Sequence, residues 1–228
     1  PVVPREDFDS DGRYHKIRVD EWGTTWEYRL YGVWGYRIGY PLADMANLET
    51  YFPPVPRPLS GKALEDAAAA GAALRQEYFH LGGGLSLFET MQSLRPFEDV
   101  LVDISRDTAE INRLADMLVE TNLQQLADPL AAGVDAVMVG DDFGTQSNMM
   151  MAPKTWRRFF IPRYQRLFAP VLAAGKRIFF HSCGQIAPIL DDLRDLGVDA
   201  IWPQLQLFDP RLLARRCREA RLAVMLHP

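Results

Sequence analysis

The chain has 228 residues, of which 48% are hydrophobic and 24% are charged, so it can form one large globular domain or two small ones. Its formal net charge of −5 argues against a general binder of phosphate backbones, which needs a basic surface, and we expect no nucleic-acid partner. No apolar run approaches the ~20 residues that span a bilayer, so we expect no membrane partner.

Cysteine usage and the chain ends bear on location and completeness. The two cysteines, Cys183 and Cys217, are too few for a disulfide framework and favour a reducing, cytoplasmic location. No basic-then-apolar signal segment opens the chain. The sequence starts at Pro1 and stops at Pro228, just after a predicted strand. We therefore expect it to be part of a larger protein.

Residues 13–58 are predicted to be rich in β-structure. Between residues 14 and 40, aromatic and β-branched residues alternate with charged ones and are interrupted by glycines, which is typical of two or three antiparallel strands. Three of the five tryptophans lie here. They either cover a small core or, as we predict for Trp22, line a pocket that binds substrate. The proline-rich residues 53–58 predict an extended connector.

The next stretch predicts a helix over residues 60–77 with Ser60 as its N-cap, and then a strand over residues 78–88. Gly82, Gly83 and Gly84 interrupt this strand. They lack the spacing and the lysine of a phosphate loop, and they indicate instead a close approach of the backbone. Glu89 follows the strand as a metal ligand or as a surface carboxylate. Residues 94–102 are apolar with helical character.

From residue 108 onward, helices alternate with short apolar strands. The pattern predicts helices over residues 108–132, 153–174, 186–196 and 210–221, and strands over residues 134–139, 178–183, 198–202 and 223–226. Continuous apolar strands between helices indicate a parallel sheet that is buried on both faces. Both a (β/α)8 barrel and an open doubly wound sheet satisfy this pattern, and both place their active sites at the carboxyl ends of the strands.

Chemically capable side chains follow four of these strands. They are Asp141, Asp142 and Gln146 after the first strand, His181 and Cys183 at the second, Gln204 after the third and His227 after the fourth. The two aspartates are candidate catalytic acid–base groups or oxygen ligands, or they cap the following loop. The two glutamines are candidates for hydrogen bonding to a substrate. His227 is a candidate metal ligand or base.

His181 and Cys183 are the strongest candidates for a metal site. Side chains at positions i and i+2 of a strand point to the same face, so the imidazole and the thiol can converge on one zinc ion at about 2.0–2.3 Å. The alternative is a buried cysteine beside a hydrogen-bonded histidine. Two ligands do not complete a zinc site, and Asp142, Glu89 and His227 are the candidates for the remainder.

Three motifs resemble the uroporphyrinogen decarboxylase family: Val-Gly-Asp-Asp-Phe-Gly-Thr-Gln at 139–146, Met-Ala-Pro-Lys-Thr-Trp-Arg-Arg-Phe-Phe at 151–160, and Phe-His-Ser-Cys-Gly at 180–184. The Asp-Glu-Trp-Gly turn at 20–23 and residues 40–44 resemble its less characterised members. The resemblance implies an α/β fold of the (β/α)8 TIM-barrel type. We expect one domain over residues 1–228, an incomplete barrel that includes the β-rich excursion and connector of residues 13–58.

The family contains tetrapyrrole decarboxylases and zinc-dependent methyltransferases that move methyl groups between a corrinoid and a thiol. The His-x-Cys motif resembles the methyltransferases, in which these two residues bind zinc. The resemblance therefore implies zinc bound by His181 and Cys183, a corrinoid (cobalamin) as methyl carrier, a small-molecule thiol substrate, a corrinoid-protein partner and a homodimer as one option.

Two departures from the family pattern leave alternatives open. The methyltransferases carry a further cysteine ligand late in the chain, and Cys217, within a predicted arginine-rich helix, does not fit that position. The arginine motif of the decarboxylases is not found either. The alternatives are a metal-independent decarboxylase that acts on a tetrapyrrole and a protein that binds a tetrapyrrole or a metal without turnover.

Overall fold

The computed structural model describes residues 7–55 and 57–226. The chain folds into two compact units. Unit 1 takes its described residues from 1–54 and 90–114, and unit 2 takes its described residues from 55–89 and 115–228.

Unit 1 contains an antiparallel sheet in the order β1-β2-β3, as the alternating sequence pattern predicts. Its strands are β1 (Lys16–Val19), β2 (Thr25–Tyr28) and β3 (Tyr36–Gly39), and it also contains a 3₁₀ helix (Met45–Glu49) and α3 (Phe97–Arg106). The carboxylate of Asp20 holds the turn between β1 and β2, because it accepts hydrogen bonds from the backbone N–H groups of Trp22 and Thr24 at 2.9 Å.

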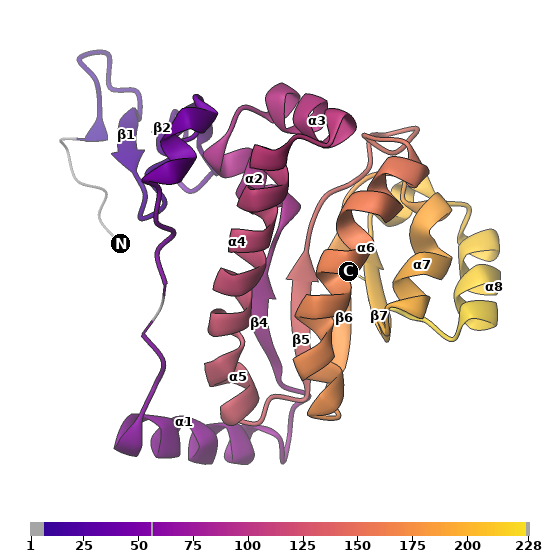
Figure 1. Ribbon diagram of the computed structural model, residues 1–228. Helices are drawn as coiled ribbons and strands as arrows, with labels where there is room; N and C mark the ends of the chain where they lie inside the picture. Colours follow the sequence, from indigo (N-terminus) through magenta and orange to yellow (C-terminus); the bar gives the residue numbers. More distant parts are fainter. Residues whose placement is uncertain (1–6, 56, 227–228) are drawn as a thin grey trace. The chain divides into compact units, whose positions relative to one another are not determined.

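Unit 2 contains a parallel five-stranded sheet in the order β4-β5-β6-β7-β8. The strands are β4 (Leu81–Leu85), β5 (Ala136–Gly140), β6 (Arg177–Ser182), β7 (Ala200–Pro203) and β8 (Ala223–Val224). In Figure 1, the strands of this sheet that are labelled there, β4 to β7, run side by side, and all of their pairings are parallel. Their carboxyl ends therefore meet at one edge of the sheet, and the parallel sheet predicted from the sequence is confirmed.

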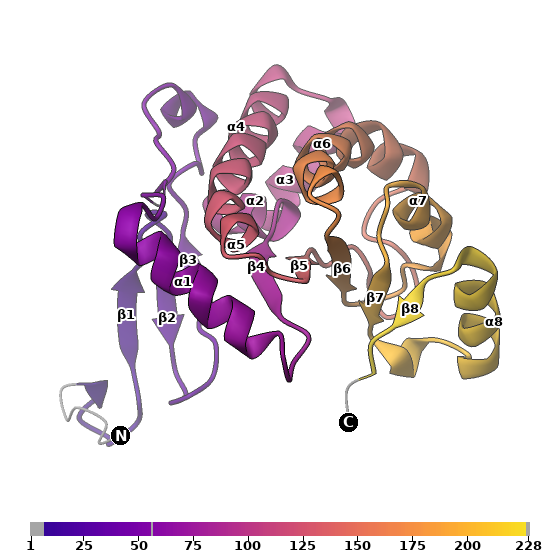
Figure 2. The same cartoon turned by 90° about the horizontal axis from the view of Figure 1, so that it is seen from below.

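Helices connect the strands of unit 2. They are α5 (Ala127–Ala131), α6 (Pro153–Ala173), α7 (Leu190–Asp195) and α8 (Pro210–Ala220), and α1 (Gly61–Leu74) precedes the first strand of the sheet. The helices α2 (Phe88–Leu94) and α4 (Ala109–Gln125) each contain residues of both units. In Figure 2, α6 and α7 lie on one side of the sheet. Along β6, Ile178, Phe180 and Ser182 are buried, whereas Phe179 and His181 are only partly buried.

Aromatic side chains fill the core between α6 and the sheet. Phe143, just after β5, stacks on Phe88 with ring centroids 5.1 Å apart and meets Phe160 of α6 edge-on at 4.8 Å. Trp156 and Tyr164 of α6 are fully buried in the same cluster. Large buried rings contribute about 1.5–3 kcal/mol each through burial. This cluster anchors the segment that follows β5.

Prolines and capping explain where the predicted elements were wrong. The helix expected over 108–132 ends at Gln125, because Pro129 has no N–H to bond the carbonyl four residues earlier. The helical stretch expected over 94–102 is instead α2 and α3, separated near Pro96, the N-cap of α3. The strand expected over 78–88 shortens to β4 because Phe88 starts α2. The last strand ends at Val224.

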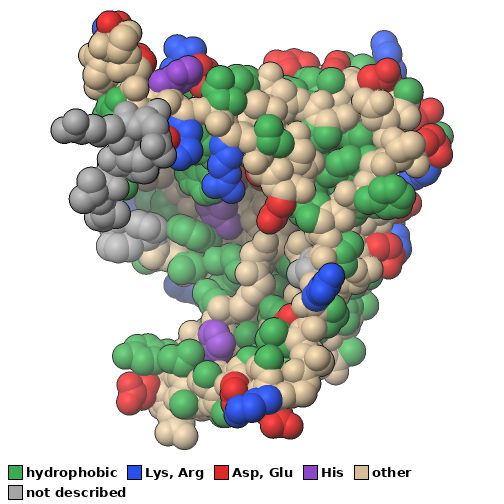
Figure 3. Space-filling view, turned by 90° about the vertical axis from the view of Figure 1, so that its left-hand side faces the viewer, with side chains coloured by type: hydrophobic (Ala, Val, Ile, Leu, Met, Phe, Trp, Pro, Cys, Tyr) green, Lys and Arg blue, Asp and Glu red, His purple; other side chains and the backbone are tan. Residues whose placement is uncertain are grey.

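No helix among residues 7–55 and 57–226 is long and apolar enough to cross a membrane. On the face shown in Figure 3, lysine and arginine side chains are scattered among acidic ones and form no continuous basic patch. This distribution agrees with the net charge of −5.

Candidate metal centre

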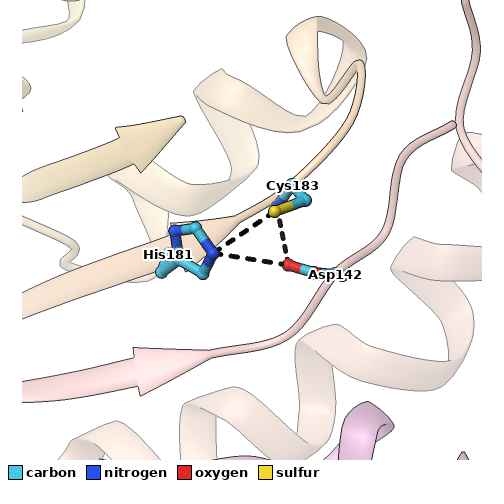
Figure 4. Close-up of side chains that lie close together, drawn as sticks. All are labelled: Asp142, His181 and Cys183. Carbon is cyan, nitrogen blue, oxygen red and sulfur yellow. Dashed lines mark hydrogen bonds and ion pairs between the residues drawn. The ribbon is translucent and has the colours of Figure 1, made fainter. Parts of the chain in front are cut away.

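Three side chains that can bind a metal meet at the carboxyl edge of the parallel sheet (Figure 4). His181 lies in β6, Cys183 directly follows that strand, and Asp142 lies two residues after β5. The parallel register pairs Gly140 of β5 with His181, so the ends of the two strands are adjacent. The potential ligand atoms all lie within 4.8 Å of one another.

Two of the three separations between these atoms match those around a tetrahedral zinc ion. The Sγ atom of Cys183 is 3.5 Å from Nε2 of His181, and Nε2 is 3.6 Å from Oδ1 of Asp142. Ligand atoms bound to zinc at 2.0–2.3 Å in tetrahedral geometry are roughly 3.5 Å apart. Thiolate, imidazole and carboxylate are also the three side-chain ligands that zinc prefers in proteins. The three residues therefore fit a zinc ion, with a fourth position left over.

The tautomer of His181 suits metal binding. Its Nδ1 lies 2.8 Å from the backbone carbonyl oxygen of Trp202. A carbonyl only accepts, so Nδ1 carries the hydrogen and Nε2 presents its lone pair toward Cys183 and Asp142. The indole of Trp202 also lies against the imidazole, with ring centroids 4.6 Å apart. A hydrogen-bonded outer nitrogen is the usual support of a metal-binding histidine.

Hydrogen bonds fix the backbone of Cys183 and of the residue that follows it. The N–H of Cys183 donates to Oδ1 of Asp142 at 2.6 Å, and the N–H of Gly184 donates to Oε1 of Gln204 at 3.1 Å. These contacts join the ends of β5, β6 and β7 around the cysteine. Gln204, a candidate for substrate binding, thus holds the cysteine loop through its side-chain oxygen.

The environment of Cys183 disfavours its thiolate. Burial makes the largest contribution and the negative charges of Asp142 and Glu89 add to it, and together they raise the pKa of the thiol to about 11. The thiol is therefore protonated near neutral pH in the metal-free protein, and a metal must displace its proton in order to bind sulfur. The effect of Glu89 places its carboxylate in the electrostatic neighbourhood of the site.

Two glycines allow the segments that carry Asp142 and Cys183 to approach each other closely. A Cβ atom at Gly184 would meet the backbone of Gly144 closer than 3.0 Å, and one at Gly144 would meet the backbone of Gly184 and Gln185 equally closely. The N–H of Gly144 donates to the carbonyl of Cys183 at 3.2 Å. Gly184 also has a left-handed φ of +79°. Only glycine allows this contact, which holds Asp142 beside Cys183.

Asp141 has a different environment from its neighbour Asp142. It is fully buried, and its carboxylate accepts hydrogen bonds from the Ser86 hydroxyl at 3.0 Å, the Leu87 N–H at 2.9 Å, the Glu89 N–H at 2.9 Å and the Tyr164 hydroxyl at 2.5 Å. Burial raises its pKa to about 6, although these donors oppose the rise. Because no surface of Asp141 reaches solvent, we propose a positioning role in place of the catalytic role inferred from sequence.

The cluster of three does not include the other predicted site residues. Gln146 is exposed on the loop after β5, and Trp22 is a partly buried residue of unit 1. Glu89 is partly buried near the start of α2, next to the Asp141 network. His227 lies outside the described residues. Two roles remain predictions. They are substrate binding by Trp22, Gln146 and Gln204, and metal ligation by Glu89 or His227.

Three features of the site were not predicted from the sequence: Trp202, Tyr164 and the Gly144–Gly184 contact. Trp202 acts through its backbone carbonyl, which carries no residue-specific signal. The glycines of the Asp-Phe-Gly and His-Ser-Cys-Gly motifs were a usable signal, because a glycine just after a candidate ligand on each of two strands indicates a close approach. Cys217 is buried within α8, as expected for a cysteine that takes no part in the cluster.

Comparisons with known proteins bear on the family and the fold of the chain. The family model of uroporphyrinogen decarboxylase (URO-D) matches residues 37–211, well over half of the chain. A solved methyltransferase from Methanosarcina mazei is similar with a TM-score of 0.57 and 16% sequence identity, over 92% of this chain. The chain spans 58% of the length of that methyltransferase. No curated protein matches the sequence.

These findings confirm the resemblance and the fold class inferred from the sequence. The five parallel strands and their helices are part of a (β/α)8 barrel of the family type, and the three-stranded antiparallel sheet is the expected N-terminal excursion. The chain belongs to the uroporphyrinogen decarboxylase family.

Proposed function

We propose that this chain is part of a zinc-dependent methyltransferase that transfers a methyl group from a methylated corrinoid, carried by a partner protein, to a small-molecule thiol. The observation that carries the proposal is the cluster of three ligand atoms, with Nε2 of His181 3.5 Å from Sγ of Cys183 and 3.6 Å from Oδ1 of Asp142. The likeness to a methyltransferase in fold is consistent with it.

His181, Cys183 and Asp142 would hold the zinc ion, and Glu89 is the candidate for a fourth ligand because its charge acts on Cys183. Zinc supplies Lewis acidity that lowers the pKa of a bound thiol. The protein's own part is to orient these ligands. The Trp202 carbonyl fixes His181, and Gln204 and the glycine contact fix the cysteine loop.

The methyl transfer conserves atoms and electrons. A sulfur lone pair of the acceptor forms the new C–S bond, while the Co–C bond of the methylated corrinoid breaks with both electrons remaining on cobalt, which changes from Co(III) to Co(I). The thiol proton leaves to solvent. Because the thiolate is the nucleophile, the protein must favour ionisation of the acceptor thiol before the methyl group arrives.

Methyl transfer to thiols tests the proposal. The full-length protein, loaded with zinc, is expected to convert methylcobalamin and a thiol to cob(I)alamin and a methyl thioether, which absorbance and mass spectrometry detect. His181→Ala and Cys183→Ala should each lower the rate at least about 100-fold, and a chelator should abolish it. Full activity after chelation would contradict the proposal.

A decarboxylase would need cationic groups that face the substrate carboxylates. In the described part of the chain, no lysine or arginine lies within two residues after the carboxyl end of any of the five parallel strands. This observation disfavours the decarboxylase. Decarboxylation of a tetrapyrrole by the full-length, chelator-treated protein would support it.

The pKa of Cys183 predicts how zinc affinity depends on pH. Since the thiol pKa is about 11 without metal, binding releases one proton from Cys183 throughout the range from about pH 7.5 to 9.5. The apparent affinity should therefore rise about tenfold per pH unit. Competition with a chromophoric chelator, corrected for its own protonation, measures this slope. Cys217→Ser should keep the slope, because that thiol lies in α8 outside the cluster.

A further inference from the structure

The less buried face of the parallel sheet carries more than the metal cluster. In β6, Phe179 and His181 are only partly buried, whereas the residues that alternate with them are buried. In β5, Met138 and Gly140 are likewise partly buried. The parallel register pairs Met138 with Phe179 and Gly140 with His181. Because alternate residues of a strand share a face, all four lie on the face that presents the imidazole.

Gly140 leaves unfilled space beside this imidazole. A Cβ atom at Gly140 would have no neighbouring atom within 4 Å, which is the outer limit of ordinary carbon–carbon contacts. On the side of β5 away from β6, Gly83 and Gly84 of β4 are exposed and bring no side chain to the sheet. A glycine within a strand often marks a place where a ligand approaches the backbone. The metal cluster does not use this run of glycines.

Apolar side chains form the floor of the space. Met138 lies two residues before Gly140 in β5, and Phe179 is its partner in β6. The ring of Phe79, just before β4, packs against Phe179 with ring centroids 5.6 Å apart. Thioethers and aromatic rings both make favourable contacts with an aromatic ligand. We call the space beside Gly140, with Met138 and Phe179 as its floor, the inner recess.

The imidazole of His181 is anchored on the side away from the inner recess. Its Nδ1 lies 2.8 Å from the carbonyl oxygen of Trp202, and the indole lies against it with ring centroids 4.6 Å apart. Trp202 belongs to β7, and β6 separates β7 from β5. The imidazole is therefore held from the β7 side, which agrees with the open space on the side of β5.

The strands that form the inner recess carry little charge. Among the residues of the five parallel strands, all of which the structure describes, Arg177 alone is a lysine, arginine, aspartate or glutamate. It lies four residues before His181, about 13 Å along the strand, and its Nη1 donates to Asp199 at 2.7 Å. At the carboxyl end, the negative charge of Asp142 belongs to the metal cluster. The floor is thus apolar, and the charge beside it faces the metal position.

The inner recess lies at the level where a barrel builds its active site. Gly140 is the last residue of β5, and His181 is the last but one of β6. In a (β/α)8 barrel, active sites form at the carboxyl ends of the strands, and layers of side chains fill the interior below them. Met138 and Phe179 belong to such a lower layer. The strands that complete the barrel therefore need not fill the space beside Gly140.

We infer that the inner recess binds the substituent of the thiol that receives the methyl group, that this substituent is a compact aromatic group, and that Gly140 sets its permitted size because it has no side chain. The inference rests on the proposed function and adds to it the class of acceptor and a residue that determines specificity.

Two thiols of different size test the class of acceptor. The full-length, zinc-loaded protein is supplied with methylcobalamin and either phenylmethanethiol or ethanethiol, which share the HS–CH2 group and differ in a phenyl ring against a methyl group. We expect kcat/KM to be at least about tenfold higher for phenylmethanethiol, because even one methylene in an apolar pocket changes it about tenfold or more. Equal values, or a preference for ethanethiol, would overturn the inference.

Gly140→Val separates the effect of the recess from the intrinsic reactivity of the two thiols. Valine suits a strand, and its side chain would enter the space beside His181. The ratio of kcat/KM for phenylmethanethiol to that for ethanethiol should fall at least about tenfold, with an intermediate ratio for Gly140→Ala. The zinc content of each variant shows whether the metal site is intact, and if valine displaces the metal, Gly140→Ala carries the comparison. An unchanged ratio in the zinc-loaded variants would contradict the role of Gly140.

A binding measurement separates this inference from the proposed function. In protein labelled with 13C at the methionine methyl groups, phenylmethanethiol should shift the resonance of Met138, which Met138→Leu identifies, and should shift it less in Gly140→Val. If neither thiol is methylated, the proposed function fails, and the Met138 resonance alone decides about the recess, with or without zinc. A shift that Gly140→Val reduces would support the recess, and an unchanged resonance would refute it.

Discussion

Gly184→Ala is expected to destabilise the protein and to weaken zinc binding together. The left-handed φ of +79° costs an alanine about 1–2 kcal/mol. The new Cβ would also collide with the backbone of Gly144, and forced overpacking costs a further 1–3 kcal/mol or so. We therefore expect the free energy of unfolding to fall by about 2–5 kcal/mol.

The same collision would act on the metal site. It forces apart the segments that carry Asp142 and Cys183, whose contact depends on a 2.6 Å hydrogen bond. In the fraction that remains folded, zinc affinity should fall at least about tenfold. Urea unfolding followed by circular dichroism and zinc titration measure the two effects.

Gly140→Ala is the matched control for this prediction. Gly140 ends β5 with an ordinary φ, and a Cβ atom there would have nothing within 4 Å. Its free energy of unfolding and zinc affinity should stay close to those of the natural protein. If Gly184→Ala were as stable as Gly140→Ala and bound zinc equally well, the contact between the two glycines would have no role in holding the site.

Asp141→Ala should lower the stability of the protein more than Asp142→Ala does. Asp141→Ala removes the acceptor of four donors, of which the Leu87 N–H and the Tyr164 hydroxyl are buried and the Ser86 hydroxyl and the Glu89 N–H are partly buried. An unsatisfied buried donor costs about 1–3 kcal/mol, and the loss of stability should reach about 3–5 kcal/mol. Asp142 is partly exposed, so Asp142→Ala should cost about 1 kcal/mol, mainly for the hydrogen bond from Cys183.

Zinc binding should respond in the reverse order. Asp142→Ala removes a proposed ligand and should lower zinc affinity more than about 100-fold, whereas Asp141→Ala should change it about tenfold in the folded fraction. Urea unfolding and zinc titration of both variants test the distinction. Loss of zinc binding in Asp141→Ala with full binding in Asp142→Ala would reverse our assignment of the two carboxylates.

The sequence predicted the parts of the site that depend on one strand. The period of two along β6 places His181 and Cys183 on the same, less buried face, and the apolar strands between helices predict a parallel sheet with its chemistry at the carboxyl edge. The position of Asp142 beside this pair follows from the same rule, because β5 and β6 are neighbours in the sheet.

The roles of Asp141 and Asp142 could not be separated from sequence. The two residues are identical and adjacent, and their difference arises from groups distant in the chain. Tyr164 comes from α6, and the N–H groups of Leu87 and Glu89 come from the segment after β4. No local pattern indicates which carboxylate these donors will meet.

The backbone contact that orients His181 could not be predicted from the sequence either. The carbonyl of Trp202 fixes the tautomer of His181, and any residue at that position offers the same oxygen. The end of α4 at Gln125 was predictable in principle from Pro129, because a proline inside a helical pattern interrupts the hydrogen-bond ladder.

Metal content of the purified full-length protein tests the central claim most directly. Elemental analysis, without chelators in any buffer, is expected to give about one zinc per chain for the natural protein and for Cys217→Ala, and almost none for Cys183→Ala. Cys217→Ala is the control, because it removes the chain's other thiol and leaves the cluster intact. Full zinc content in Cys183→Ala, or no metal in the natural protein, would contradict a zinc site built on Asp142, His181 and Cys183.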